Sequence, residues 1–145
     1  MGLPHFGKSL ISWSSKNQRT VTLSSTEAEF VALTDVTREV MWLQPIFKFL
    51  GYKKIESVTI IFEDNRPAIH LASNQQTKGR TKHFNVKVKF ISELIEQKIF
   101  KIQKVNTAEN CAETMTKPLG RVQFFKHREK YMSDLLNLRE KMKVT

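Results

Sequence analysis

The sequence is poor in the residues that crosslink or anchor a protein. Cys111 is the only cysteine among 145 residues, so no disulfide can form within the chain and no multi-cysteine cage can hold zinc. No apolar run approaches the roughly 20 residues that span a bilayer. The first residues also lack the basic-then-apolar order of a secretory signal. We therefore expect an intracellular protein, nuclear or cytoplasmic, with no membrane partner.

Acidic residues are also few. Lysine and arginine number 24 against 14 acidic residues, which leaves a net charge of +10. This excess favours a polyanionic partner such as nucleic acid, although composition alone does not separate nucleic acid from an acidic membrane surface. The length predicts a single domain over residues 1–145, because one domain commonly takes roughly 100 to 150 residues.

Strand and helix patterns alternate along the chain. Residues 84–97 fit both a strand alternation and a helical stripe, and we choose the helix. Residues 122–142 predict an amphipathic helix, within a C-terminal region 121–145 that closes the domain or contacts a partner. The expected strands are 10–14, 20–23, 58–62 and 99–105, the first two joined as a hairpin, and the other expected helices are 24–50, 66–72 and 107–115.

The helix over residues 24–50 carries a carboxylate on its apolar face. Glu29 extends a stripe of apolar residues at spacings of three and four, which we expect to face the core. Ser24 and Thr26 each have a glutamate three residues later, so Glu29 can instead be the last member of a capping box. Pro45 removes a backbone donor and predicts a kink or break near Gln44. The apolar stripe comprises Leu33, Val36, Val40, Leu43, Phe47 and Leu50.

Two further acids stand at the ends of expected elements. Asp64 follows the strand over residues 58–62, and Glu113 lies in the segment that begins after Asn106. Together with Glu29 they predict a shared site and a place for a metal ion. A turn with a helix cap explains Asp64 and Asn65 equally simply, and a favourable acid near a helix start explains Glu113.

Five motifs carry a family resemblance: Ile11-Ser12-Trp13-Ser14-Ser15-Lys16, Leu23 to Phe30, Glu63-Asp64-Asn65, Arg80-Thr81-Lys82-His83 and Thr116-Lys117-Pro118-Leu119. They resemble the ribonuclease H domain of copia-type retrotransposon polyproteins. They occur in the family's order and cover about residues 10 to 138. The resemblance implies an α/β fold, a ribonuclease H-like mixed β-sheet flanked by helices, and cleavage of the RNA strand of RNA/DNA hybrids.

The resemblance also implies a catalytic site with two divalent ions, Mg²⁺ or Mn²⁺, held by carboxylates. The family's helix glutamate falls on Glu29, its strand-end aspartate on Asp64 and its late acid on Glu113. These three are the expected catalytic and metal-binding residues. A basic stretch beside them favours contact with phosphates, although it also fits a merely solvated face. The expected nucleic-acid-binding residues are Asn65, Lys78, Arg80, Lys82, His83 and Lys87.

Two departures from the family pattern argue against full activity. Glu113 stands where the family has aspartate, and its extra methylene displaces the carboxylate. Residues 1–10 contain no acid, so the family's first metal-bridging aspartate and its strand have no counterpart in their usual place. A sheet without its first strand has an open edge, so we also expect a homodimer or a protein partner bound through that edge or the C-terminal helix.

Three functions follow from these observations. The preferred one is a retrotransposon-derived, domesticated domain that binds an RNA/DNA hybrid or duplex and has weakened or lost catalysis, a pseudoenzyme. The second is an active two-metal ribonuclease H, a hydrolase whose missing ligand comes from elsewhere. The third is a non-catalytic protein-interaction module that keeps the fold as a scaffold.

Overall fold

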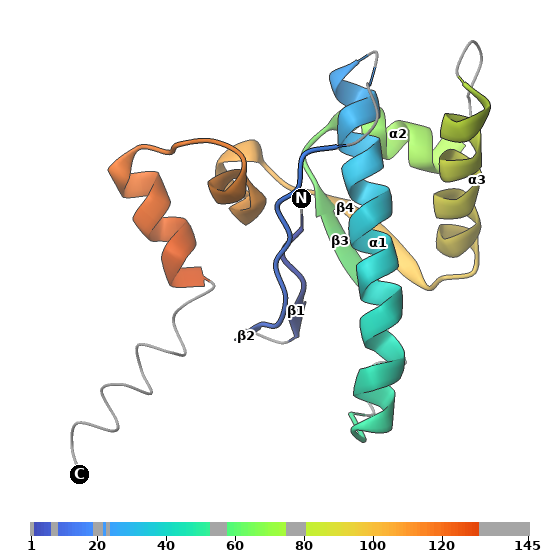
Figure 1. Ribbon diagram of the computed structural model, residues 1–145, viewed down its shortest axis with the longest axis horizontal. Helices are drawn as coiled ribbons and strands as arrows, with labels where there is room; N and C mark the ends of the chain where they lie inside the picture. The colour runs from blue at the N-terminus through green and yellow to red at the C-terminus, as the bar shows by residue number, and fades with distance from the viewer. Residues whose placement is uncertain are drawn as a thin grey trace.

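The computed structural model describes residues 2–6, 9–18, 22, 24–52, 58–74 and 81–130. This part of the chain is mixed α/β, with helices beside a parallel pair of strands and a separate short hairpin (Figure 1). The helices are α1 (Ser25–Phe49), α2 (Arg66–Asn74) and α3 (Lys82–Glu96), and residues 121–130 are also helical. The strands are β1 (His5–Phe6), β2 (Ser9–Leu10), β3 (Thr59–Glu63) and β4 (Phe100–Lys104). None of the helices within these ranges is both long and apolar enough to cross a membrane.

The parallel pair β3 and β4 is the centre of the described structure. Ile61 is paired with Ile102, and α2 and α3 form the connection that parallel strands require. Helix α1 runs antiparallel to β3, because Gln44 near its end donates to the Thr59 hydroxyl at 3.1 Å while Glu29 near its start interacts with the charge of Asp64. The start of α1 and the carboxyl end of β3 therefore lie at the same end of the molecule (Figure 1).

One hydrophobic core joins the three helices to the sheet. Phe30 of α1 is fully buried and its ring lies 5.4 Å from that of Phe84 on α3. Burying a side chain of this size contributes about 2 to 3 kcal/mol relative to exposure. The other core residues are Leu33, Ile61, Ala68, Leu71, Ala72, Val88, Ile91, Leu94 and Phe100.

Most of the expected regular elements are confirmed. Helix α1 begins as its cap predicts, because the Ser24 hydroxyl accepts from the Glu27 amide at 3.2 Å, and it ends before Gly51, which has a φ of +81°. The helix over residues 84–97 is α3, so the choice of helix over strand is confirmed. The break that Pro45 predicted near Gln44 is wrong, since α1 continues through both residues. Pro45 itself is exposed.

The expected strand over residues 10–14 is wrong. The hairpin joins β1 to β2 with His5 opposite Leu10, so only Leu10 of the expected strand 10–14 belongs to it. Ser14 instead exchanges two backbone bonds with Gly2, at 3.1 and 3.0 Å. A Cβ on Gly2 would lie 2.3 Å from Val36, so this close approach to α1 requires glycine. Of the expected strand 20–23, only residue 22 lies in the described ranges, and it has no regular structure.

The expected helix over residues 107–115 is two 3₁₀ turns. They are η2 (Thr107–Glu109) and η3 (Cys111–Met115). The Asn106 side chain caps the first by accepting from the Ala108 amide at 3.0 Å, and Asn110 caps the second in the same manner at 3.1 Å. Because Asn110 caps a new turn directly after the first one, the segment does not form a continuous α-helix. The final helix agrees with the prediction over residues 122–130, and residues 131–142 lie outside the described ranges.

Candidate functional site

A pocket of about 1020 Å³ opens beside the parallel strands. Its lining comes from the N-terminal segment, one face of α1, the whole of β3 and the two 3₁₀ turns. Glu29, Asp64 and Glu113, the three predicted site residues, all line it. Segments far apart in the sequence thus bring the predicted acids to one cavity.

Most of the apolar stripe of α1 lines this pocket, and its first member, Leu33, also belongs to the core, where the sequence pattern predicted the whole stripe. Val36, Val40 and Leu43 are only partly buried and line the pocket. The core-facing side of α1 instead includes Phe30 with Thr34 and Thr37, whose hydroxyls donate to carbonyls one turn earlier. These internal bonds satisfy the threonine hydroxyls, which allows the polar residues to occupy the core.

Glu29 and Asp64 form the negative end of the pocket. Desolvation raises the pKa of Glu29, and the nearby charge of Asp64 raises it further. Glu29 nevertheless keeps much of its surface in water, and Asp64 is half-buried. The sequence therefore located two carboxylates that interact across the space between α1 and β3.

Glu63 is a third acid at this end, and the sequence analysis did not select it. Its residue is 7% exposed, and burial raises the pKa of its carboxyl to about 7, with smaller contributions from the charges of Glu29 and Asp64. The Asn65 amide donates to it at 3.0 Å, which opposes the increase. Strand alternation could have identified Glu63 as buried, because residues two positions apart lie on the same face of a strand and Ile61 is buried.

The other two predicted polar residues have local partners. Glu113 forms an ion pair with Lys117 at 2.5 Å. The Asn65 side chain accepts from the Ala68 amide at 3.0 Å and so caps α2, which confirms the helix-cap interpretation for this residue.

The described acids do not fit a pair of divalent ions as they stand. Among the residues that the structure describes, no three His, Cys, Asp or Glu side chains are grouped closely enough to hold a metal. The Glu113 carboxylate forms an ion pair with Lys117. Burial raises the pKa of Glu63 to about 7, so its carboxyl is only partly ionised at neutral pH. Metal binding by Glu29, Asp64 and Glu113 therefore stays a prediction.

The basic stretch is described in part. Lys82 and His83 are exposed in the first turn of α3, and Lys87 is partly exposed one turn later. Thr81 caps this helix by accepting from the Phe84 amide at 3.4 Å. Lys78 and Arg80 lie outside the described residues.

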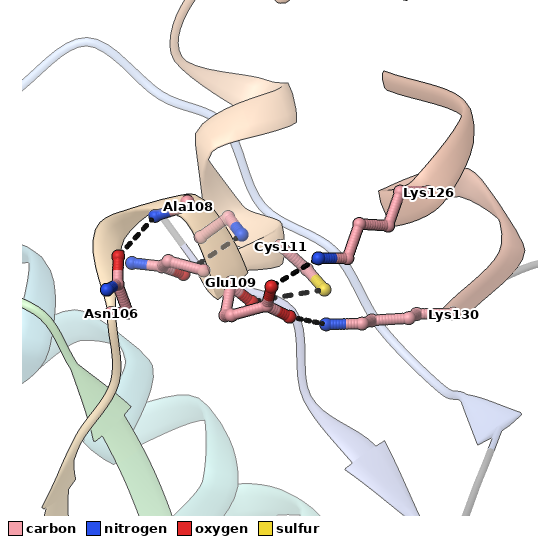
Figure 2. Close-up of polar contacts among 8 residues, drawn as sticks. Asn106, Ala108, Glu109, Cys111, Lys126 and Lys130 are labelled. Carbon is pink, nitrogen blue, oxygen red and sulfur yellow. Dashed lines mark hydrogen bonds and ion pairs between the residues drawn. The ribbon is translucent and has the colours of Figure 1, made fainter. Parts of the chain in front are cut away.

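A second charged cluster fixes the final helix beside the pocket (Figure 2). Glu109 of η2 accepts from both Lys126 and Lys130, the latter at 2.8 Å, and Lys130 also lines the pocket. The hydrogen bond from Lys126, followed by that from Lys130, lowers the pKa of Glu109 to about 2. The sequence analysis missed this cluster, because no local pattern connects residues separated by 17 and 21 positions.

Comparison with known proteins finds relatives among transposon polyproteins. The chain is 38% identical over 119 residues to the retrovirus-related Pol polyprotein from transposon TNT 1-94 of Nicotiana tabacum. It is 34% and 33% identical over 120 residues to the corresponding proteins from transposons RE2 and RE1 of Arabidopsis thaliana. These alignments cover 82 to 83% of this chain but only 8 to 9% of each polyprotein.

No protein-family model matches the chain, and no solved structure matches it. The retrotransposon part of the expected resemblance is confirmed by the three polyproteins. The chain is homologous to a short segment of retrovirus-related Pol polyproteins from transposons.

Proposed function

We propose that the chain is a retrotransposon-derived, ribonuclease H-like domain that binds an RNA/DNA hybrid or duplex and has weakened or lost catalysis. The observation that carries this proposal is the exposed basic first turn of α3 in a chain of net charge +10. Lys82 is the first residue of α3, where the helix dipole disfavours a positive charge by about 0.3 to 1 kcal/mol. Because helix stability does not explain a lysine there, contact with phosphates is the better explanation.

The position of this turn relative to the carboxylates also supports the proposal. Helix α2 begins directly after Asp64 and Asn65 and packs against α3. Its nine residues span about 13 Å at 1.5 Å per residue. Helix α2 thus connects the acids at the end of β3 to the helix that carries the basic turn.

Weakened catalysis is proposed from the state of the acids. Glu113 is neutralised by Lys117, and Glu63 is held partly protonated near pH 7. Glu29 and Asp64 are left as the carboxylates available to a cation. Two dications facing so few negative charges would be poorly held.

An active ribonuclease H is the second candidate, because Glu29, Asp64 and Glu113 do line one pocket. In that function Mg²⁺ or Mn²⁺ would polarise the scissile phosphate, and a ligand from another chain would complete the site. The two candidates predict the same binding and different cleavage.

The test measures binding of a labelled RNA/DNA hybrid at several salt concentrations. We expect log K to fall with log salt by about 0.9 for each phosphate contacted. The variant Lys82→Gln/Lys87→Gln should reduce that slope by about 2 in total. Lys48→Gln, which removes one lysine charge from the exposed last turn of α1, is the control for loss of charge elsewhere and should have little effect. Equal slopes for all three proteins would contradict the proposed surface.

The cleavage assay uses the same hybrid with Mg²⁺ and then Mn²⁺. We expect little cleavage by the wild type and by Asp64→Asn. Rapid cleavage that Asp64→Asn abolishes would replace the proposal by the second candidate.

A further inference from the structure

Strand β3 has a free edge within the described part of the chain. Its sheet contains only β3 and β4 there, so one side of β3 has no partner strand. The Thr59 amide donates to the Ile99 carbonyl at 3.1 Å, and the Glu63 carbonyl accepts from the Val105 amide at 3.0 Å. Residues 59, 61 and 63 thus direct their backbone groups to β4. By alternation, the amides and carbonyls of Ile60 and Phe62 point the other way.

The pocket lies along β3, and its opposite wall is apolar. All five residues of β3 line it, together with Val36, Val40 and Leu43 of α1. Leu3 and Pro4 of the N-terminal segment add to this wall. A row of backbone donors and acceptors beside an apolar wall is the arrangement that binds an extended peptide by strand addition. A helix has no free backbone groups to offer along its length, so it would leave the edge unpaired.

The charge at one end of the groove restricts the occupant further. Glu29, Glu63 and Asp64 line the groove at the carboxyl end of β3, so three carboxyl groups gather there. A basic side chain at this end would form ion pairs with these carboxyl groups. Charge complementarity therefore selects a peptide with lysine or arginine at this point.

We propose that this groove binds an extended peptide strand from another polypeptide, which pairs with Ile60 and Phe62 along the free edge of β3. Alternate apolar side chains of that strand lie against the α1 stripe, and a lysine or arginine lies beside Glu63 and Asp64. A strand matching the five residues of β3 is about 17 Å long. The interaction is separate from nucleic-acid binding, which uses the first turn of α3.

The probe is a short acetylated peptide of alternating valine and threonine with lysine at both ends, so that either strand direction places a charge correctly. Its binding to the intact chain is followed by the backbone amide shifts of Ile60 and Phe62 in a nitrogen-15 titration. The control peptide has the same sequence with alternate backbone nitrogens methylated, which removes the donors and keeps the side chains. We expect the control to bind at least tenfold more weakly, since it loses two or more hydrogen bonds.

Two protein variants locate the interaction. Leu43→Lys places a charge in the apolar wall and should abolish binding, whereas Val86→Lys on the exposed face of α3 should leave it unchanged. Circular dichroism confirms that each variant is folded. Asp64→Asn should weaken the lysine-ended peptide severalfold and leave a threonine-ended peptide unaffected.

Several results would overturn the proposal. Equal binding of the methylated peptide would show that the β3 edge is not used, and tighter binding of a glutamate-ended peptide would contradict the charge assignment. Sedimentation of the chain alone provides the remaining test. The chain alone could form a dimer that Leu43→Lys dissociates and that the peptide does not displace. This result would assign the groove to a second copy of the chain.

Discussion

Replacing Glu63 by glutamine should make the protein more stable at neutral and alkaline pH. Burial raises the pKa of Glu63 from 4.5 to about 7, so the folded state binds this proton more tightly than the unfolded chain. The stability that this group contributes is present below pH 4.5 and is lost as pH rises to about 7. A shift of about 2.5 units at 1.36 kcal/mol each corresponds to about 3 kcal/mol.

Glutamine keeps the size of Glu63 and the acceptor for the Asn65 amide, but it carries no charge at any pH. We therefore expect Glu63→Gln to exceed the wild type in unfolding free energy by about 2 to 3 kcal/mol at pH 8. At pH 4.5 the advantage should nearly vanish. Urea unfolding followed by circular dichroism at both pH values measures the difference, in which titrations common to the two proteins cancel.

Glu93→Gln is the matched control on the surface. Glu93 is exposed, and a carboxylate oxygen of its side chain lies 3.8 Å from the Lys89 ammonium nitrogen. Exposed ion pairs of this kind contribute less than about 1 kcal/mol to the free energy of unfolding. This variant should stay close to the wild type at pH 8. If Glu63→Gln is no more stable than the wild type at pH 8, or if its advantage is the same at both pH values, the argument from a buried, charge-crowded Glu63 is refuted.

Four further substitutions test the fold by urea unfolding. Ser24→Ala removes the cap on the Glu27 amide and should cost about 1 kcal/mol, and an unchanged midpoint would contradict the cap. Gly51→Ala has open space around the new methyl group but a φ of +81°, so it should cost about 1 kcal/mol through backbone strain alone. Phe30→Ala should cost about 3 to 5 kcal/mol, whereas Phe62→Ala, at a side chain 58% exposed, should cost much less.

The sequence predicted the elements whose signals are local. The cap at Ser24 and the stop at Gly51 bound α1 correctly, and the helical stripe through Phe84 and Val88 outweighed the competing strand pattern. Local signals failed where two of them conflict. Ser14 pairs with Gly2 of the N-terminal segment in place of the expected hairpin strand. Asn110 caps a second turn where one continuous helix was expected.

The sequence predicted which residues belong to the candidate site better than it predicted how they are arranged. Glu29, Asp64 and Glu113 share a pocket as expected, yet their partners depend on packing that periodicity does not specify. The stripe of α1 identified an apolar face but not what covers it, because a face toward a groove and a face toward the core have the same spacing. Glu63 was visible from strand alternation, although its high pKa requires knowing how deeply β3 is buried.

The interaction of the chain with an RNA/DNA hybrid tests the central claim most directly. Binding and cleavage are measured together, on one labelled hybrid, with Lys82→Gln/Lys87→Gln beside the wild type. We predict binding that weakens steeply with salt, a shallower salt dependence in the variant, and little cleavage in Mg²⁺ or Mn²⁺. Absence of hybrid binding at low salt would contradict the claim.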